Sequence, residues 1–100
     1  MTVPSLLERL LAAASDGDIE EVRHVLDDGA PINGLSGGRT ALHAAVVADH
    51  EPLVDLLLER GADVRAINAD EETPLGYTSG ALYQKLAARW AELSGPDAAH

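Results

Sequence analysis

The sequence predicts an all-α repeat solenoid, a row of similar helix pairs joined by turning loops. Hydrophobic residues make up 46% of its 100 residues, most of them Ala or Leu, and none is Phe. This balance favours helices packed through small side chains over a β-sandwich or barrel. Internal repetition agrees with it: residues 16–30 correspond to 48–62 at a spacing of 32, and Thr40-Ala41-Leu42 corresponds to Thr73-Pro74-Leu75 at a spacing of 33. The extra residue belongs to a connecting loop.

The first unit is expected to hold two helices, over residues 5–14 and 18–28. The first is a short Ala/Leu helix, and the second carries one buried stripe at helical spacing, formed by Ile19, Val22, Val25 and Leu26. Asp18 suits the N-cap of this second helix. Gly29 follows its end, where a left-handed backbone is needed.

The second unit repeats this plan with helices over residues 41–48 and 51–60. Its buried stripe comprises Leu53, Val54, Leu57 and Leu58. Asp49 or His50 occupies the junction between the helices, Pro52 suits a first turn, and Gly61 follows the end. Residues 30–39 and 62–72 are rich in Pro, Asn, Gly and Asp, which predicts extended, turning connections.

The third unit begins like the second at Thr73-Pro74-Leu75 and then departs from it. Residues 81–93 still predict a helix whose stripe is Leu82, Leu86, Trp90 and Leu93. We expect a degenerate terminal unit that caps the row, with Trp90 sealing the end of the core. The expected arrangement is a single domain over residues 1–100, with units of about 5–37, 38–70 and 71–95 and a tail over 96–100.

These motifs resemble the ankyrin repeats. Thr40-Ala41-Leu42-His43-Ala44-Ala45 is similar to the Thr-Pro-Leu-His-x-Ala opening of that family, and Gly61-Ala62-Asp63-Val64 is similar to its loop signature. The resemblance covers about residues 5–93. It implies antiparallel helix pairs in a curved stack with hairpin fingers, and a structural role for His43. The sequence departs from the family at Arg65, where Asn is usual, and at Glu71, where Gly is usual. The first finger is also one residue short.

Composition excludes several kinds of partner. With 17 acidic and 7 basic residues, the formal net charge is −10, which repels nucleic acid and anionic membranes. No apolar stretch is long enough to span a bilayer, so we expect a cytoplasmic protein. The excess of Arg over Lys and the abundance of Ala suggest a bacterial coding sequence.

The sequence contains little that indicates a catalytic site or a cofactor-binding site. The stretch from Gly34 to Thr40 differs from a phosphate-binding loop in spacing and has Arg39 where Lys belongs. No His pair has metal-ligand spacing, and there is no Cys. The acids are patterned as helix caps and solvated faces. We therefore expect no enzyme activity and no cofactor.

The function that remains is protein binding. The family resemblance implies a partner surface on the concave face, made by the finger tips and the exposed positions of each first helix. The implied residues are Ser15, Asp16, Leu35, Gly37, Arg39, Val47, Ala48, Ile67, Ala69, Asp70 and Glu72, to which we add Tyr77 and Tyr83 as aromatic candidates from the third unit. This mixture of apolar and acidic residues predicts a partner protein with a basic and apolar patch, and an inhibitor, adaptor or accessory role.

A structural role is the alternative. The degenerate third unit would then form a homo-oligomer or join an obligate complex through Tyr77, Tyr83 and Trp90. In the binding-module interpretation the chain is a monomer or a weak homo-oligomer. A mass that depends on concentration would separate the two interpretations.

Overall fold

The computed structural model describes residues 3–94, so the predicted tail over residues 96–100 lies outside the described part. In chain order, the elements are α1 (Leu6–Asp16), α2 (Ile19–Asp27), α3 (Ala41–Val47), α4 (Glu51–Glu59), the 3-10 helix η1 (Pro74–Tyr77) and α5 (Gly80–Ser94). Each predicted helix is present, with bounds that differ by one or two residues.

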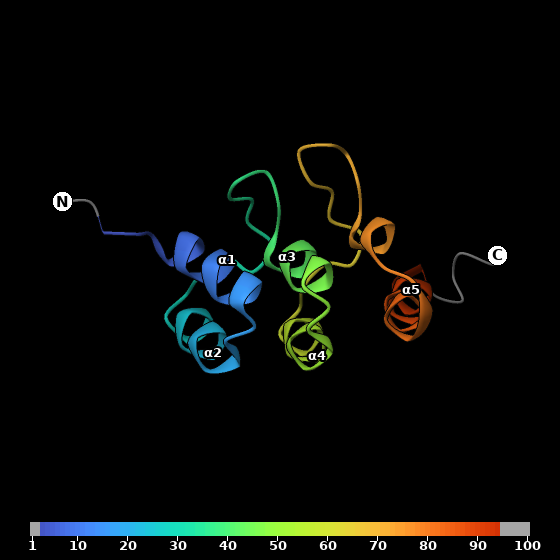
Figure 1. The fold of residues 1–100 in the computed structure, drawn as a ribbon, viewed down its shortest axis with the longest axis horizontal. Coiled ribbons are helices and arrows are strands. Elements are labelled where there is room, and N and C mark those ends of the chain that lie inside the picture. The colour runs from blue at the N-terminus through green and yellow to red at the C-terminus, as the bar shows by residue number, and fades with distance from the viewer. Residues whose placement is uncertain (1–2, 95–100) are drawn as a thin grey trace.

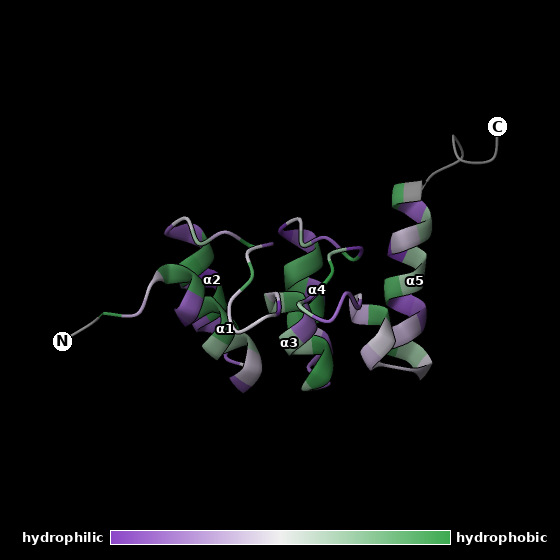
Figure 2. Ribbon diagram, turned by 90° about the horizontal axis from the view of Figure 1, so that it is seen from above, coloured by the Kyte–Doolittle hydropathy of each residue, from purple (hydrophilic) through white to green (hydrophobic). Residues whose placement is uncertain are grey.

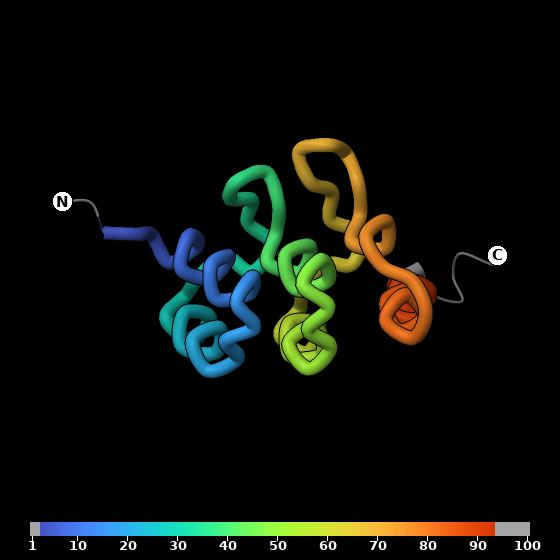
Figure 3. The backbone as a smooth tube through the Cα atoms, viewed as in Figure 1, coloured from blue at the N-terminus to red at the C-terminus, as the bar shows by residue number. Residues whose placement is uncertain are grey.

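The helices form two layers (Figure 1). The helices α1 and α3 and the short η1 make one layer, while α2 and α4 lie beneath α1 and α3. Two finger loops, residues 30–39 and 62–72, project from the first layer on the side away from α2 and α4 (Figure 3). The molecule measures 54 × 26 × 25 Å, the elongated shape expected of units that contact only their neighbours. The predicted all-α repeat fold is confirmed.

Most of the helices begin at a residue whose side chain caps the first turn. Ser5 and Glu8 form a reciprocal capping box on α1, and the side chain of Asp18 accepts a hydrogen bond from the backbone N–H of Glu21. Thr40 caps α3 in the same way. His50, one of the two residues predicted at the junction before α4, stands at the N-cap position, where its side chain makes no capping hydrogen bond. Asp49 adopts a left-handed backbone, with a φ of 59°.

The two glycines predicted to end the second helices do so by one mechanism. The φ angles are 102° at Gly29 and 94° at Gly61. After α2, the N–H of Ala30 donates to the carbonyl of Val25 at 2.9 Å; after α4, the N–H of Ala62 donates to Leu57 at 2.9 Å. These are Schellman motifs, which satisfy the last carbonyls of each helix and turn the chain into the finger.

The core runs continuously between the two layers and consists mainly of Leu, Val and Ala. Leu57 is fully buried, as its helical stripe predicts, and Leu42 of α3 is almost completely buried. The stripe of α2 is less complete, because Ile19 and Leu26 are only partly buried against the core. The helices α1 and α3 pack against each other, and their alanines Ala13, Ala14, Ala41, Ala44 and Ala45 are buried.

The fingers explain why the two repeat spacings differ by one residue. In the first finger, Ser36 and Arg39 pair across a two-residue turn, with φ angles of 63° at Gly37 and 79° at Gly38. Positive φ at both positions is what a type I′ hairpin turn requires. In the second finger, the N–H of Asn68 donates to the carbonyl of Glu72 at 2.9 Å, which encloses three residues. The added residue therefore lies in the turn.

The third unit keeps only part of the repeat plan. In place of a first helix it has η1, and its second element, α5, is the longest helix of the described chain and stands apart from α4 (Figure 2). Leu82 and Leu86 are buried, and Trp90 packs against the core while remaining partly exposed. The prediction that Leu93 belongs to the buried stripe of this helix is wrong. Its side chain is 44% exposed, because it lies near the end of a helix that extends beyond its neighbours.

The first unit has a polar outer face. Arg9 and Glu21 form an ion pair at 3.2 Å, with both side chains more than a third exposed. At the equivalent positions, 32 residues later, the second unit has the buried Ala41 and Leu53. Polar residues at positions that are apolar in an internal unit are characteristic of the end of a repeat array.

Candidate functional site

The predicted binding residues of the first unit meet where α1 approaches the first finger. The guanidinium of Arg39 donates to the hydroxyl of Ser15 at 3.0 Å, which joins the end of α1 to the returning half of the finger. Asp16 follows Ser15 and is exposed, and Leu35 lies before the hairpin turn with 52% of its surface exposed. These predicted residues are thus held near one another by the fold.

The second unit builds the same junction from different residues. His43 on α3 is buried, and its Nε2 donates to the carbonyl oxygen of Glu72 at 2.8 Å. Val47 lies one helical turn after His43, on the same side of the helix. By repeat equivalence, Val47 and Glu72 occupy the places of Ser15 and Arg39. The second unit therefore presents an aliphatic side chain and a carboxylate where the first presents a hydroxyl and a guanidinium.

Three large aliphatic side chains stand exposed on this part of the molecule. They are Leu35, Val47 and Ile67, each between 52% and 55% exposed. Leu35 and Ile67 are equivalent, because each immediately precedes the residue that opens the hairpin of its finger. Exposed aliphatic residues at matching places in neighbouring fingers form a recurring feature and not an isolated exposure.

The finger tips are joined to each other by their backbones. The N–H of Ala69 in the second finger donates to the carbonyl of Gly38 in the first at 2.8 Å. A Cβ at Gly38 would lie 3.0 Å from the Cβ of Ala69, so glycine permits this close approach. Gly37 beside it is exposed. The fingers therefore present a connected edge and not two independent loops.

Tyr77 is engaged within the chain, which the sequence did not indicate. Its hydroxyl accepts a hydrogen bond from Nδ2 of Asn68 at 2.8 Å and donates to Oε1 of Glu72. Its ring meets that of His43 edge to face, with centroids 6.1 Å apart. The hydrogen bond to Glu72 is the main cause that raises the pKa of Tyr77. Tyr77 thus fixes the second finger to η1 and keeps part of its ring at the surface.

The remaining predicted residues divide between two places. Ala69 and Asp70 are exposed at the tip of the second finger, and Ala48 is half-buried at the end of α3. Tyr83 is exposed, but it lies on α5, outside the layer that carries the fingers (Figure 1). The structure brings Tyr77 to the finger surface and leaves Tyr83 away from it.

Asn68 organises the second finger and was not among the predicted residues. Its Oδ1 accepts hydrogen bonds from the N–H groups of Asp70 at 2.9 Å and Glu72 at 3.0 Å. Asn readily forms such side-chain turns, and its place in the acidic segment Asn68–Glu72 was the available signal. The buried Asn68 therefore holds the exposed acids of the finger in place.

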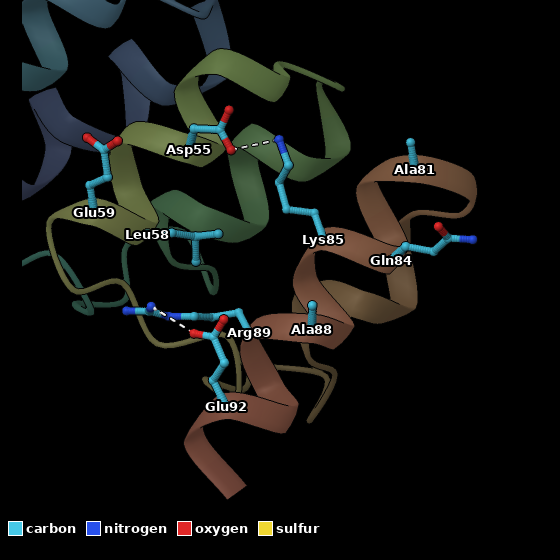
Figure 4. Close-up of a pocket in the computed structure, with 9 residues that line it drawn as sticks. All are labelled: Asp55, Leu58, Glu59, Ala81, Gln84, Lys85, Ala88, Arg89 and Glu92. Carbon is cyan, nitrogen blue, oxygen red and sulfur yellow. Dashed lines mark hydrogen bonds and ion pairs between the residues drawn. The ribbon is translucent and has the colours of Figure 1, made fainter. Parts of the chain in front are cut away.

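An open groove of about 770 Å³ lies between α4 and α5 (Figure 4). Lys85 crosses it to reach Asp55 at 2.7 Å and Glu51 at 2.8 Å. Both hydrogen bonds raise the pKa of Lys85, and the one to Asp55 has the larger effect. Leu58 and Ala88 line the groove, and no His, Ser or Thr does. The ion pairs join α5 to the second unit.

Residues 3–94 offer neither a metal cluster nor a membrane span. No group of three or more His, Cys, Asp or Glu side chains in this range is arranged to hold a metal ion. No helix in the same range is long and apolar enough to cross a membrane.

Together, the stacked helix pairs, the projecting fingers and the polar end face define a helical repeat protein whose exposed surface recurs from unit to unit. Residues 8–79 match the family described as ankyrin repeats, in three copies. The chain belongs to the ankyrin repeat family. Ankyrin repeats are non-catalytic modules for protein–protein interaction. The match ends directly before α5, the element that departs most from the repeat plan.

Curated relatives share the repeats and are longer proteins. The chain is 44% identical over 64 residues to an ankyrin repeat-containing protein, P1E11.10, of Schizosaccharomyces pombe, covering 63% of this chain and 31% of that protein. It is 36% identical over 81 residues to human ankyrin repeat domain-containing protein 40, covering 79% and 22%. It is 41% identical over 71 residues to the E3 ubiquitin-protein ligase XBAT33 of Arabidopsis thaliana, covering 68% and 14%. These relatives are eukaryotic, so they give no support to the bacterial origin predicted from composition.

Proposed function

We propose that this chain binds a partner protein through its finger-side face and acts as an inhibitor, adaptor or accessory subunit. The finger-side face consists of Ser15, Asp16, Leu35, Gly37, Arg39, Val47, Ala48, Ile67, Ala69, Asp70, Glu72 and Tyr77. The observation that carries the proposal is the matched exposure of Leu35 and Ile67 in neighbouring fingers. Aliphatic residues that are half exposed at equivalent positions give a partner two spaced apolar contacts.

The fold supports binding with little ordering cost. The turns of both fingers are closed by backbone hydrogen bonds, and the Ala69–Gly38 bond joins the tips. Asn68 and Tyr77 further fix the second finger through side-chain hydrogen bonds. A surface that is already ordered loses less conformational entropy when it binds.

Charge indicates the chemistry of the partner. The tip of the second finger carries three exposed acids in a row, Asp70, Glu71 and Glu72, beside the exposed Ile67. The first finger carries Arg39 at the place of Glu72. A partner with an apolar patch bordered by Lys or Arg therefore complements the second finger, and like charges disfavour an acidic partner.

Affinity purification tests this proposal. The wild-type chain is used as bait in a lysate of the organism from which it comes, beside an Ile67→Ser variant and a His24→Ser control. His24 is exposed on α2, away from the fingers. We expect one stoichiometric partner, retained by the wild type and the control and lost with Ile67→Ser. Equal recovery with all three baits would contradict the proposed face.

One observation favours a second function, assembly through the third unit. Tyr83 and Leu93 of α5 are each more than two fifths exposed, and Trp90 is partly exposed. Tyr83 and Trp90 are seven residues apart, so they lie on one face of the helix. Sedimentation equilibrium distinguishes the two functions. A monomer at all concentrations opposes assembly, whereas a dimer disrupted by Tyr83→Glu supports it.

A further inference from the structure

The first finger contains an Asn-Gly pair, Asn33-Gly34, at the junction between the first two units. In such a pair the side-chain amide is chemically labile, because glycine has no Cβ to block the approach of its backbone nitrogen to the Asn carbonyl carbon. Asparagine is among the thermolabile residues of proteins for this reason. The sequence contains one other Asn, Asn68, which precedes Ala69 and so provides an internal comparison.

The folded chain holds both reacting groups in place. The side-chain Oδ1 of Asn33 accepts a hydrogen bond from the backbone N–H of Asp63 at 2.8 Å. The backbone N–H of Gly34 donates to the carbonyl of Pro31 at 3.0 Å. Ring closure needs this nitrogen to turn toward the side chain of Asn33. The bond from Asp63 therefore opposes the reaction while the units are docked, and the bond from Gly34 opposes it while the first finger keeps its turn. Asn33 itself is exposed to water.

Packing explains why glycine stands at this position in spite of the lability. A Cβ at Gly34 would lie 3.0 Å from both terminal methyl groups of Leu7 and 3.2 Å from the carbonyl oxygen of Pro31. The first finger therefore passes close to α1 at Gly34. A larger residue would suppress the chemistry but would force Leu7 or the finger to move.

We propose that Asn33-Gly34 is a site of spontaneous deamidation that the docking of the first two units restrains. The Gly34 nitrogen bonds to the Asn33 side-chain carbon, its proton passes through water to the side-chain amide nitrogen, and the bond from that carbon to the amide nitrogen breaks. Ammonia leaves, and a five-membered succinimide remains. One water molecule then opens the ring, giving either an ordinary aspartyl residue at this position or an isoaspartyl linkage. No oxidant, cofactor or second enzyme is needed.

The products weaken the junction that restrained the reaction. Both products carry a new carboxylate beside that of Asp63, where the intact amide is neutral. The isoaspartyl product also adds one carbon to the backbone path next to Gly34, at the close approach to Leu7. Once the reaction has occurred, the first finger therefore docks less readily against the second unit. This inference is independent of the proposed partner surface, because Asn33 is not part of it.

The first experiment compares the folded and unfolded chain. Purified protein is incubated in warm, mildly alkaline buffer made with heavy-oxygen water, with and without urea, and proteolytic fragments are followed by mass spectrometry. We expect heavy oxygen to enter at Asn33 rapidly in urea and much more slowly in the folded protein, with Asn68 slower than Asn33 in urea. Equal rates at Asn33 in the two conditions, or no reaction in urea, would overturn the proposal.

A pair of substitutions at Asp63 tests the restraint itself. Asp63→Pro removes the N–H that donates to Asn33, and the first unit already has proline, Pro31, at the equivalent position. Asp63→Ala removes the same carboxylate but keeps the N–H. We expect Asp63→Pro to react about fivefold faster than Asp63→Ala, the effect of one net hydrogen bond. Equal deamidation rates at Asn33 in two folded variants would contradict the proposal that this hydrogen bond restrains the reaction. If circular dichroism shows that Asp63→Pro is unfolded, the first experiment, which compares the wild-type chain with and without urea, tests the restraint instead.

Discussion

The imidazole Nε2 of His43 lies 2.8 Å from the backbone carbonyl oxygen of Glu72, although 29 positions separate the two residues. The same ring places Nδ1 2.7 Å from the hydroxyl oxygen of Thr40. Because Nε2 must donate to the carbonyl, Nδ1 of the neutral ring accepts from the hydroxyl. His43 thus connects the start of α3 to the returning half of the second finger through one uncharged side chain.

Stability should fall on acidification because of His43. Burial lowers its pKa below 6.5, while the hydrogen bond to Glu72 and the charge of that residue act in the opposite direction. The unfolded chain then binds the proton more readily, so this stability is complete above pH 6.5 and is lost as pH falls through the lowered pKa. Urea unfolding at a series of pH values measures it. We expect a flatter profile for His43→Gln, and parallel profiles would contradict the assignment.

The core assignments predict large losses at two leucines. Leu42 and Leu57 are almost fully buried, so replacing either with Ala should cost about 2–5 kcal/mol of unfolding free energy through lost burial and cavity formation. Leu35→Ala is the matched control, since the same substitution at an exposed finger position should change stability by less than about 0.5 kcal/mol. Chemical denaturation checks both. Similar losses at Leu35 and Leu57 would contradict the core assignment of Leu57.

Glu71 should be a site where glycine stabilises the chain. Its φ is 62°, in the left-handed region, and its equivalent in the first finger is Gly38, with a φ of 79°. The left-handed conformation costs a residue with a Cβ about 1 kcal/mol, so Glu71→Gly should raise the unfolding free energy by up to that amount. Gly38→Ala should lower it, because the new Cβ meets Ala69. Thermal denaturation of both variants measures whether stability rises or falls. A lower stability of Glu71→Gly would contradict the claim that the backbone at Glu71 is strained.

Much of this fold could be predicted from the sequence because its signals are local. The caps at Ser5, Asp18 and Thr40, the glycine stops and the 3/4 spacing of leucines depend on neighbours within one or two turns. The left-handed Asp49 and Glu71 could not be predicted, since the backbone there follows the stacking of units and overrides residue preference. In the first unit and its finger these positions hold Gly17 and Gly38.

The site could be predicted only in outline. The family resemblance implied Leu35, Val47 and Ile67, and the side chains of all three are exposed. The hydrogen bonds of Tyr77 with Asn68 and Glu72 depend on how η1 meets the finger, and no residue spacing encodes that meeting. The position of Tyr83 depends on α5, which lies outside the repeat pattern.

Charge reversal at the second finger should slow partner association. Asp70 is exposed at the tip, so Asp70→Lys should lower the association rate with the partner recovered by affinity purification and weaken its dependence on salt. Glu20→Lys on α2 makes the same charge change away from the fingers and serves as the control. Stopped-flow or surface-binding kinetics at several salt concentrations measure the effect. Equal slowing by both variants would indicate a response to net charge alone.

Site-specific photo-crosslinking tests the central claim, that the finger-side face contacts a partner protein. A photoreactive amino acid is placed at Ile67 in one sample and at His24 on α2 in another, and both are irradiated in lysate. We predict a crosslinked second protein from position 67 and none from position 24. A crosslink that forms from position 24 and not from 67, or crosslinked dimers of the chain alone, would contradict the claim.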